Sequence, residues 1–279
     1  MLVIQTLDEL KDVLFRVKSS GKSVGFVPTM GALHDGHLSL LQRAKKENTA
    51  VVCSIFVNPV QFNNAADYTQ YPRTLEKDID YISEVADIVF APSQEEIFPT
   101  VPTEKYHFGI LESVMEGAYR PNHFNGVAII VKRLFDWIMP DKAYFGEKDY
   151  QQLVIIKELV RESNMPIEII GCPIVREPNG LAMSSRNKRL SPEELQIAPN
   201  IYRILQGSLS QMHLSVEGMK KYVVDEIGKI SAFKLEYFEI ANAETLQPVS
   251  SLDEANSIIG CIALYLGSVR LIDNIMIKK

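Results

Sequence analysis

A continuous apolar run over residues 50–57, AVVCSIFV, constrains the fold of this chain more than any other stretch. Such a run is typical of a strand in a parallel sheet, because helices cover both faces of that kind of sheet. A second apolar run over 24–27 precedes it, and between the two lies a segment with the leucine spacing of a helix face, at about 38–47. Strand, helix and strand in this order indicate a βαβ unit.

The same alternation continues along the first 175 residues. Further strands are expected over 87–92, 143–145 and 167–170, and further helices over 6–20, 74–85, 124–139 and 150–163. This pattern predicts an α/β fold with a doubly wound parallel sheet and right-handed crossovers. In such a sheet the ligand lies beyond the carboxyl ends of the strands. Polar turns at 34–37, 58–62 and 146–152 each follow a strand, so we expect them to converge on one crevice.

The pattern changes after Val175. A loop rich in Arg, Ser and Asn is expected over 176–191, and a helical region over 192–230. Two apolar segments follow over 235–240 and 258–266, and a strand-like end over 269–277. We therefore predict a nucleotide-binding domain over 1–175 and a smaller α+β domain over 176–279. The polar segments 63–72 and 94–102 are expected to be loops.

Composition and charge exclude several classes of protein. A net charge of −6 over 279 residues argues against a large nucleic-acid interface. No apolar run reaches the length of a membrane span, and the start MLVIQTLDEL lacks the features of a signal peptide, so we expect a cytoplasmic protein without a membrane partner. Cys53, Cys172 and Cys261 lie far apart in apolar surroundings, which favours buried structural thiols over a zinc site or disulfides.

Two histidines three residues apart, His34 and His37, follow the apolar run 24–27 where a helix is expected to begin. A helix start exposes unpaired backbone N–H groups and the positive end of the helix dipole, so it attracts phosphate. Both imidazoles can donate to phosphate oxygens as a nucleoside triphosphate loses pyrophosphate. The alternative is a pair of ordinary surface or core histidines.

Cations mark two further segments. Lys148, in the turn 146–149, supplies a positive charge at a second expected helix start, although a solvated turn capped by Asp149 is the alternative. The loop 183–189, MSSRNKR, carries two hydroxyls and three cations. It suits a flexible clamp that closes on a triphosphate, with a solvated linker as the alternative.

Other polar residues carry weaker signals. Asn58 and Gln61 place two amides at a strand end, which suits a small polyhydroxy acid better than a metal. Arg120 and His123 precede a helix and are most often surface residues in that setting.

Two pairs of residues are expected to be structural. Asp78 and Asp80 resemble a solvated helix face, although a carboxylate there can help to hold Mg²⁺. Phe135 and Trp137 are expected to lie in the core.

Taken together, these segments closely resemble the pantothenate synthetase family, the pantoate–β-alanine ligases, over nearly the whole chain. The motifs are PTMGALHDGH at 28–37, FVNPVQF at 56–62, YPRTLEKD at 71–78, RPNHFNGVA at 120–128, FGEKDYQQL at 145–153, VREPNGLAMSSRN at 175–187 and VRLIDNI at 269–275. The resemblance implies a Rossmann-like sheet of the nucleotidyltransferase type. It also implies that ATP and pantoate give pantoyl adenylate and pyrophosphate, after which β-alanine attacks the adenylate and releases pantothenate and AMP. Mg²⁺, a homodimer and a C-terminal domain acting as a lid are further implications.

The resemblance also implies roles for individual residues. His37 is the expected acid–base or charge-stabilising residue, assisted by His34, and Lys148, Ser184 and Arg186 complete the expected catalytic set. The expected ATP-binding residues are Met30, Gly31, Ala32, Leu33, His34, Asp35, Gly36, His37, Gly146, Glu147, Lys148, Asp149, Val175, Met183, Ser184, Ser185 and Arg186. The expected substrate-binding residues are Gln61, Gln152, Asn58 and Arg120. No side chain is assigned as a metal ligand.

Four positions depart from the family pattern: Ile129 stands where Thr is usual, Ile174 where Thr is common, Asn179 where Asp is common, and Asn242 where Asp is frequent. Two other functions stay open. One is a different nucleotidyltransferase of the same fold, which would stop at a nucleotide product. The other is a non-catalytic module that binds ATP without turnover.

Overall fold

The structure is a computed structural model that describes residues 1–63 and 65–278, and over these residues the chain divides into two compact units. The first unit comprises Met1–Phe108, Arg120–Glu147 and Ile155–Pro173; the second comprises Gly109–Tyr119, Lys148–Val154 and Ile174–Lys279. A domain boundary after residue 175 stays a prediction.

The first unit alternates strands and helices. Its regular elements are β1 (Leu2–Ile4), α1 (Leu7–Ser19), β2 (Val24–Thr29), α2 (Asp35–Glu47), β3 (Ala50–Ile55), η1 (Pro59–Gln61), α3 (Ala65–Gln70), α4 (Leu75–Ile82), β4 (Ile88–Phe90), α5 (Gln94–Ile97), α7 (His123–Ile138), β5 (Lys142–Gly146) and β6 (Glu168–Cys172). The short η3 (Glu147–Asp149) and the helix α8 (Tyr150–Glu162) contain residues of both units.

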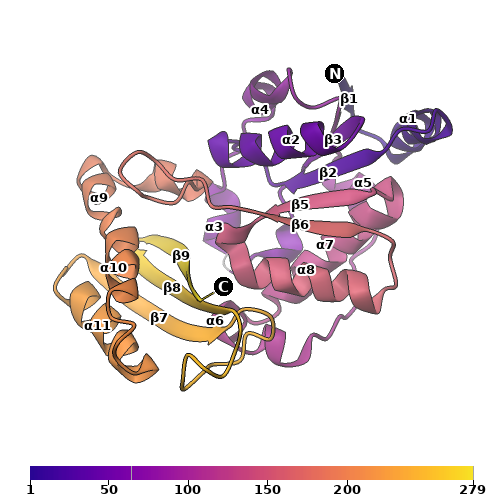
Figure 1. The fold of residues 1–279 in the computed structure, drawn as a ribbon. Coiled ribbons are helices and arrows are strands. Elements are labelled where there is room, and N and C mark those ends of the chain that lie inside the picture. Colours follow the sequence, from indigo (N-terminus) through magenta and orange to yellow (C-terminus); the bar gives the residue numbers. More distant parts are fainter. Residues whose placement is uncertain (64, 279) are drawn as a thin grey trace. The chain divides into compact units, whose positions relative to one another are not determined.

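Over the described residues, the strands of the first unit form one six-stranded parallel sheet in the order β1-β4-β3-β2-β5-β6 (Figure 1). The chain runs from β2 through β3 to β4 in one direction, and from β5 to β6 in the other. The order therefore reverses between β2 and β5. The crevice beyond the carboxyl ends at such a reversal is where open parallel sheets bind ligands.

Helices cover both faces of this sheet, as its unbroken apolar strands require. On one face α2 and α4 pack against β2, β3 and β4 through a shared core that includes Leu41, Ala44, Ile82, Val27, Val51, Cys53 and Val89. On the other face, α7 places Phe135 edge-on to Phe26, with ring centroids 6.2 Å apart. Trp137, which is half-buried, lies edge-on to Phe90 at 6.3 Å. The predicted core position of Phe135 is confirmed.

Short helices occur in two segments that were expected to be loops. Within 63–72 the helix α3 forms, and the Arg73 guanidinium donates to the Tyr68 carbonyl near its end. Within 94–102 the helix α5 forms, and Ser93 accepts the Glu96 N–H as its cap. The loop prediction is wrong there because these single turns depend on local side-chain bonds rather than on apolar periodicity. Asn64 lies outside the described residues.

The second unit contains the remaining elements. They are η2 (Gly109–Glu112), α6 (Met115–Tyr119), η4 (Ser185–Arg189), α9 (Pro192–Ile197), α10 (Asn200–Leu209), α11 (Val216–Gly228), β7 (Phe233–Asn242), β8 (Ile258–Leu266) and β9 (Val269–Lys278). In this part of the described chain the strands form a three-stranded antiparallel sheet, β7-β8-β9. The predicted α/β fold with a smaller α+β part is confirmed.

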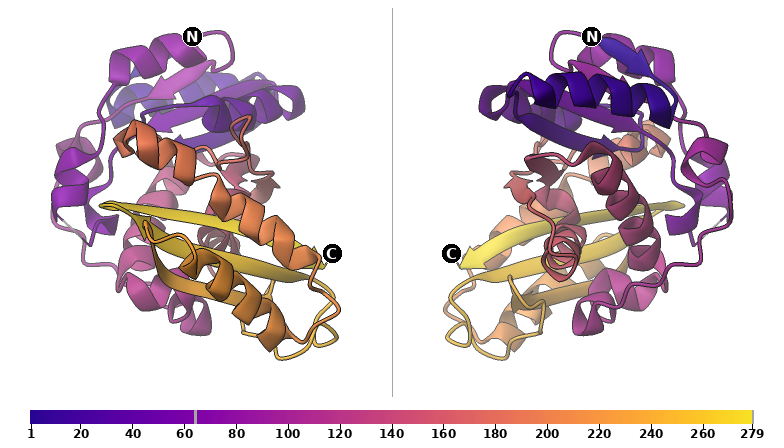
Figure 2. Two further views of the ribbon diagram at one scale, coloured as in Figure 1. Left: turned by 90° about the vertical axis from the view of Figure 1, so that its left-hand side faces the viewer. Right: turned by 90° about the vertical axis from the view of Figure 1, so that its right-hand side faces the viewer.

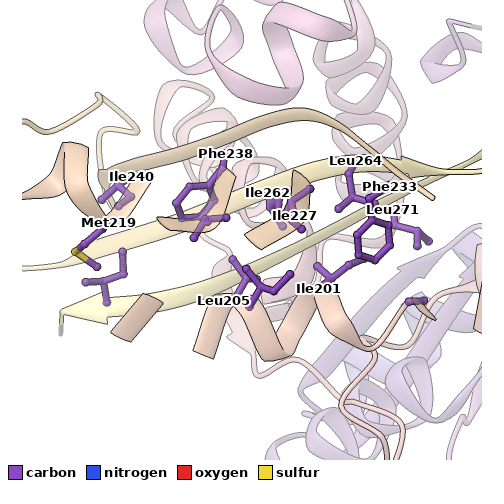
Figure 3. Packing of buried hydrophobic residues seen from close by; sticks show 14 of the residues in the cluster. Ile201, Leu205, Met219, Ile227, Phe233, Phe238, Ile240, Ile262, Leu264 and Leu271 are labelled. Atoms are coloured by element: carbon purple, nitrogen blue, oxygen red, sulfur yellow. The ribbon is translucent and has the colours of Figure 1, made fainter. Parts of the chain in front are cut away.

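The helices α10 and α11 lie along one face of this sheet, as the left view of Figure 2 shows for the orange helices and the yellow strands. Apolar side chains fill the space between helices and sheet (Figure 3). Leu205 and Met219 come from the helices, and Phe238, Ile262 and Leu271 come from the strands. The unit therefore has its own hydrophobic core.

An ionic cluster fixes α6 within the second unit. The Arg270 guanidinium, on β9, donates to the Glu116 carboxylate at 2.7 and 2.9 Å and to Glu236 at 2.9 Å. The Tyr237 hydroxyl also donates to Glu116, which is buried. A short helix that is distant in sequence is thereby tied to the antiparallel sheet.

The thiols of Cys53, Cys172 and Cys261 are free and buried in the described structure, so the predicted structural role is supported. Burial raises the pKa of the Cys53 thiol to about 12 and that of Cys172 to about 11. Among the helices that the structure describes, none combines the length and the apolar character that a membrane crossing needs.

Candidate active site

The turn between β2 and α2 lies at the reversal point of the parallel sheet. Gly31 and Ala32 both have positive φ angles, +80° and +52°. The Thr29 hydroxyl donates to the Ser54 carbonyl at 2.8 Å and so links the ends of β2 and β3. The turn thus has a fixed and unusual backbone course before α2 begins.

His34 and His37 lie side by side at the start of α2, with ring centroids 4.1 Å apart. His34 is the cap of this helix, because its Nδ1 accepts the Gly36 N–H at 3.1 Å. A ring nitrogen that accepts a hydrogen bond carries no proton, so the neutral His34 ring has its proton on Nε2. His34 is therefore both a structural cap and a hydrogen-bond donor. The closeness expected from the three-residue spacing is observed.

Asn58 and Gln61 form a buried amide pair just beyond the carboxyl end of β3. The Asn58 Nδ2 donates to Gln61 Oε1 at 2.9 Å and to the Gly126 carbonyl at 3.0 Å. The Gln61 Nε2 in turn donates to Met30 Sδ at 3.0 Å. The sequence-predicted residues Met30, Asn58 and Gln61 therefore come together in the first unit.

His123 is buried against the same amide pair, although its sequence context suggested a surface residue. Its Nδ1 lies 2.8 Å from the backbone carbonyl oxygen of Gln61, which can only accept, so Nδ1 carries the proton. Its Nε2 lies 3.2 Å from the Arg120 guanidinium, which can only donate. The order Arg120, His123, Gln61 is thus a directed hydrogen-bond chain. The Arg-x-x-His spacing before α7 is the signal that could have found it.

Gly146 ends β5, the strand next to β2 on the other side of the reversal point, and Glu147 follows it. A Cβ at Gly146 would meet no atom within 4 Å. The expected ATP-binding residues of the first unit therefore follow the ends of neighbouring strands.

The remaining expected residues belong to the second unit. The Lys148 ammonium lies 3.7 Å from Asp149, and the Lys148 carbonyl accepts from the Asn274 amide at 3.0 Å. Gln151 is buried and its amide bonds to the backbone of 111–116. Gln152 is half-buried, and its amide has no hydrogen bond to any residue that the structure describes. Gln151 is thus structural, whereas the Gln152 amide is available to a ligand.

The segment 175–183 is a hairpin with an antiparallel bridge between Arg176 and Ala182, and η4 begins shortly after it. The Met183 N–H donates to the Val175 carbonyl at 3.0 Å, and the turn closes at Gly180, with φ of +94°. Ser184 caps η4 by accepting the Arg186 N–H at 3.3 Å, and Ser185 is buried.

Arg176 anchors this hairpin and was not predicted as a functional residue. Its guanidinium binds Asp273 through two hydrogen bonds of 2.7 and 2.9 Å, donates to the Gly180 carbonyl and lies 3.5 Å from the centre of the Tyr202 ring. Burial raises the pKa of Asp273, and the charge of Arg176 opposes that rise. The VRLIDNI motif therefore supplies the anchor of the hairpin through Asp273 and a support for Lys148 through Asn274.

The structure shows the surroundings of two of the departures from the family pattern. Ile129 is buried in α7 among other apolar side chains. The Asn179 Oδ1 accepts the Leu181 N–H at 3.1 Å, a bond that an Asp carboxylate makes equally well.

Over residues 1–63 and 65–278, no three His, Cys, Asp or Glu side chains come together as a metal-binding group. The donor set therefore does not fit a metal ion held by the protein alone. A divalent ion that arrives with a triphosphate needs few protein ligands, because phosphate oxygens and water coordinate Mg²⁺ well.

Comparisons with known proteins identify the family. The family model described as pantoate-beta-alanine ligase matches residues 2–276. The chain belongs to this family. The pantothenate synthetases of Bacteroides thetaiotaomicron and Bacteroides fragilis are 50% and 49% identical to it, each over 100% of both chains.

Comparison with solved structures identifies the same family. The pantothenate synthetase of Thermus thermophilus has a TM-score of 0.93 at 42% identity, with 100% of both chains covered. The pantoate-beta-alanine ligase of Francisella tularensis, complexed with beta-gamma ATP and beta-alanine, has a TM-score of 0.83 at 36% identity and covers 99% of this chain and 97% of its own. As a member of the pantoate–β-alanine ligase family, the chain is a ligase, and the function implied by the sequence motifs is confirmed.

Proposed function

We propose that this ligase joins pantoate to β-alanine in two steps, through pantoyl adenylate. In the first step the pantoate carboxylate attacks the α-phosphorus of ATP, and pyrophosphate leaves. In the second step the amine of β-alanine attacks the acyl carbonyl, and AMP leaves with pantothenate as the product. Adenylation is needed because a carboxylate oxygen is a poor leaving group, whereas a phosphate ester leaves readily.

The pairing of His34 and His37 at the start of α2 carries this proposal. The two rings lie 4.1 Å apart at the reversal point of the sheet, and the neutral His34 ring has its donor on Nε2. Hydrogen-bond donors held in place before the reaction stabilise charge as it develops on the α-phosphate and the pyrophosphate, without reorganisation. We assign His37 the main charge-stabilising or acid–base role and His34 the supporting one.

The amide pair is assigned to pantoate. Gln61 is held by Asn58, Met30 and His123, so its position is fixed before a substrate arrives. Amides recognise hydroxyls and carboxylates without adding charge. Arg120 and Gln152 complete the assigned pantoate-binding set.

The remaining roles belong to groups around the phosphates. Met30–His37, Gly146–Asp149 and Val175 are assigned to ATP, with Lys148 on a phosphate. Met183–Arg186 is assigned to a clamp, in which Ser184 and Arg186 stabilise the departing pyrophosphate. The acyl adenylate must be kept from water, which supports assigning residues 176–279 to a lid. Mg²⁺ is assigned to the ATP phosphates, and the protein is assigned to the cytoplasm as a homodimer by its family resemblance.

The product test is direct. The purified chain is mixed with ATP, pantoate, β-alanine and Mg²⁺, and the products are identified by mass spectrometry. We expect pantothenate, AMP and pyrophosphate in equal amounts. A folded sample that yields no pantothenate contradicts the proposal.

Leaving out single substrates separates the two other functions. A nucleotidyltransferase that stops at a nucleotide would give its product without β-alanine. A binding module would hold ATP without turnover. For the ligase we expect pyrophosphate exchange into ATP that requires pantoate but not β-alanine.

A further inference from the structure

Asp78 is a buried carboxylate, although the sequence suggested a solvated helix face. It lies on α4 and is 4% exposed, whereas Asp80 on the same helix is exposed, as expected. The expectation is wrong for Asp78 because its partners are backbone amides of a distant turn, which leave no trace in the sequence pattern. A buried carboxylate needs such partners, since an unpaired charge is costly to remove from water.

Both partners belong to the turn that precedes the two histidines. The Asp78 Oδ2 accepts the Ala32 N–H at 2.9 Å, and its Oδ1 accepts the Leu33 N–H at 2.8 Å. Two successive amides point at one carboxylate because Gly31 and Ala32 both have positive φ angles. Such successive N–H groups form a small anion-binding concavity. Here the anion is a side chain of the same chain.

The fit around this carboxylate is tight. The Thr74 hydroxyl donates to Asp78 Oδ2 at 3.2 Å and does not cap α4 through a backbone N–H group. A Cβ at Gly31 would lie 3.0 Å from Asp78 Oδ2 and 3.2 Å from Ile55 Cγ2. The carboxylate and the turn therefore fix each other's position.

We infer that Asp78 is a positioning residue for adenylation. Its carboxylate holds the turn 31–33, and the turn sets where α2 begins and where its cap His34 and the neighbouring His37 point. In this arrangement Asp78 acts through the backbone of the turn. The amides of Ala32 and Leu33 are engaged by Asp78, so phosphate binding at this turn falls to the side chains that follow them. The inference rests on the proposed function for its readout.

Asp78→Asn tests this directly. The amide keeps the shape of the carboxylate, but its NH₂ group faces one of the two backbone N–H groups, so one bond is lost and two donors oppose each other. Two rates are measured at a temperature where circular dichroism shows a folded chain: pantoate-dependent exchange of pyrophosphate into ATP, and pantothenate formation from supplied pantoyl adenylate and β-alanine. We expect the turnover number for exchange to fall about 10²-fold, the loss typical of misplaced catalytic groups. The transfer from supplied adenylate should stay close to that of the unsubstituted chain.

Asp80→Asn is the matched control, since it makes the same change two residues away at an exposed position, and both of its rates should be unchanged. Equal losses in the two rates, or no loss in exchange, would overturn the inference, because a merely structural role cannot separate the two steps. If Asp78→Asn does not fold, Thr74→Val decides by the same split, with an expected loss of about tenfold in exchange for one weakened hydrogen bond. Absence of exchange by the unsubstituted chain contradicts the proposed function itself and, with it, this inference.

Discussion

His34 and His37 are close in space but differ in their bonding. The His34 Nδ1 accepts the Gly36 N–H, so His34 caps the helix. His37 lies in the first turn of α2, beside the His34 ring. The cap fixes one imidazole, and the ring contact brings the other next to it. A substitution at His37 therefore removes the second imidazole but leaves the hydrogen bond that caps the helix intact.

We predict that His37→Ala lowers the turnover number for adenylation by about 10²-fold or more, because a donor that acts in the transition state is lost. The rate of pantoate-dependent pyrophosphate exchange is the measurement. His213→Ala, at an exposed position in the second unit, is the control and should change nothing. A tenfold higher Michaelis constant for ATP with an unchanged turnover number, as for a ground-state contact, would contradict the assigned role.

Residue type and spacing predict the pairing of His34 with His37, but they do not separate neighbours of the same type. Gln151 is structural and Gln152 is available to a ligand, although they are adjacent in sequence. The difference depends on which backbone carbonyls the fold brings to each amide. Arg176 was missed for the same reason, because its partner Asp273 lies 97 residues away.

At the scale of elements, α7 and η1 are packed unusually closely. A Cβ at Gly126 would lie 2.5 Å from the Val60 carbonyl oxygen and 2.8 Å from Gln61 Cα. The Gly126 carbonyl also accepts from Asn58. The first turn of the helix is therefore the surface against which the amide pair is held.

Gly126→Ala should displace η1 and Gln61. We predict a loss of about 1–3 kcal/mol in the free energy of unfolding, as for overpacked cores. The Michaelis constant for pantoate should rise, whereas the affinity for ATP should change little. Denaturant unfolding and steady-state kinetics with each substrate varied measure these effects.

Gly228→Ala is the matched control. It lies at the end of α11, and a Cβ there meets no atom within 4 Å. Its stability should be unchanged or higher by about 0.5–1 kcal/mol, because Ala is favoured over Gly in helices. Pantoate kinetics that are equally altered in both variants would contradict the packing explanation.

Apolar periodicity predicts the long helices and buried strands closely, because their apolar faces produce a regular spacing of apolar residues in the sequence. The helix expected over 124–139 is observed as α7 over His123–Ile138. The short helices α3 and α5 have no such apolar periodicity, and local side-chain hydrogen bonds stabilise them instead.

At the scale of the whole molecule, the buried thiols make stability depend on alkaline pH. The pKa of Cys53 is raised from 9.0 to about 12 and that of Cys172 from 9.0 to about 11, in both cases mainly by burial. In the unfolded chain these thiols lose their protons near pH 9, whereas in the folded chain they keep them. The folded state therefore binds more protons between pH 9 and 11, and stability falls as the pH rises through this window.

We predict that the free energy of unfolding falls by about 1.4 kcal/mol for each of these thiols when the pH rises from 8 to 10. Urea unfolding at both pH values, followed by circular dichroism, measures the loss. The Cys53→Ala variant should be less stable overall. Its free energy of unfolding should fall less between the two pH values, by about the 1.4 kcal/mol that one thiol contributes. An identical pH dependence in the variant and the unsubstituted chain would contradict this account.

The fold class of the whole molecule follows from the sequence, whereas the extent of its compact units does not. The change in composition after Val175 marks the antiparallel part, but Glu116 belongs to the second unit through Arg270, 154 residues away. Ion pairs of this kind have no local signal. The domain boundary after residue 175 therefore stays a prediction.

The edge-on contact of Trp137 with Phe90 gives the molecule a built-in optical reporter. The chain contains one tryptophan, and it lies in the first unit. Fluorescence excited at a wavelength that only indole absorbs therefore reports the unfolding of the first unit, which contains the parallel sheet. Far-ultraviolet ellipticity reports the secondary structure of both units together. Coincident curves from the two signals mean that the units unfold as one cooperative block, and separated curves assign each transition to its unit without any label.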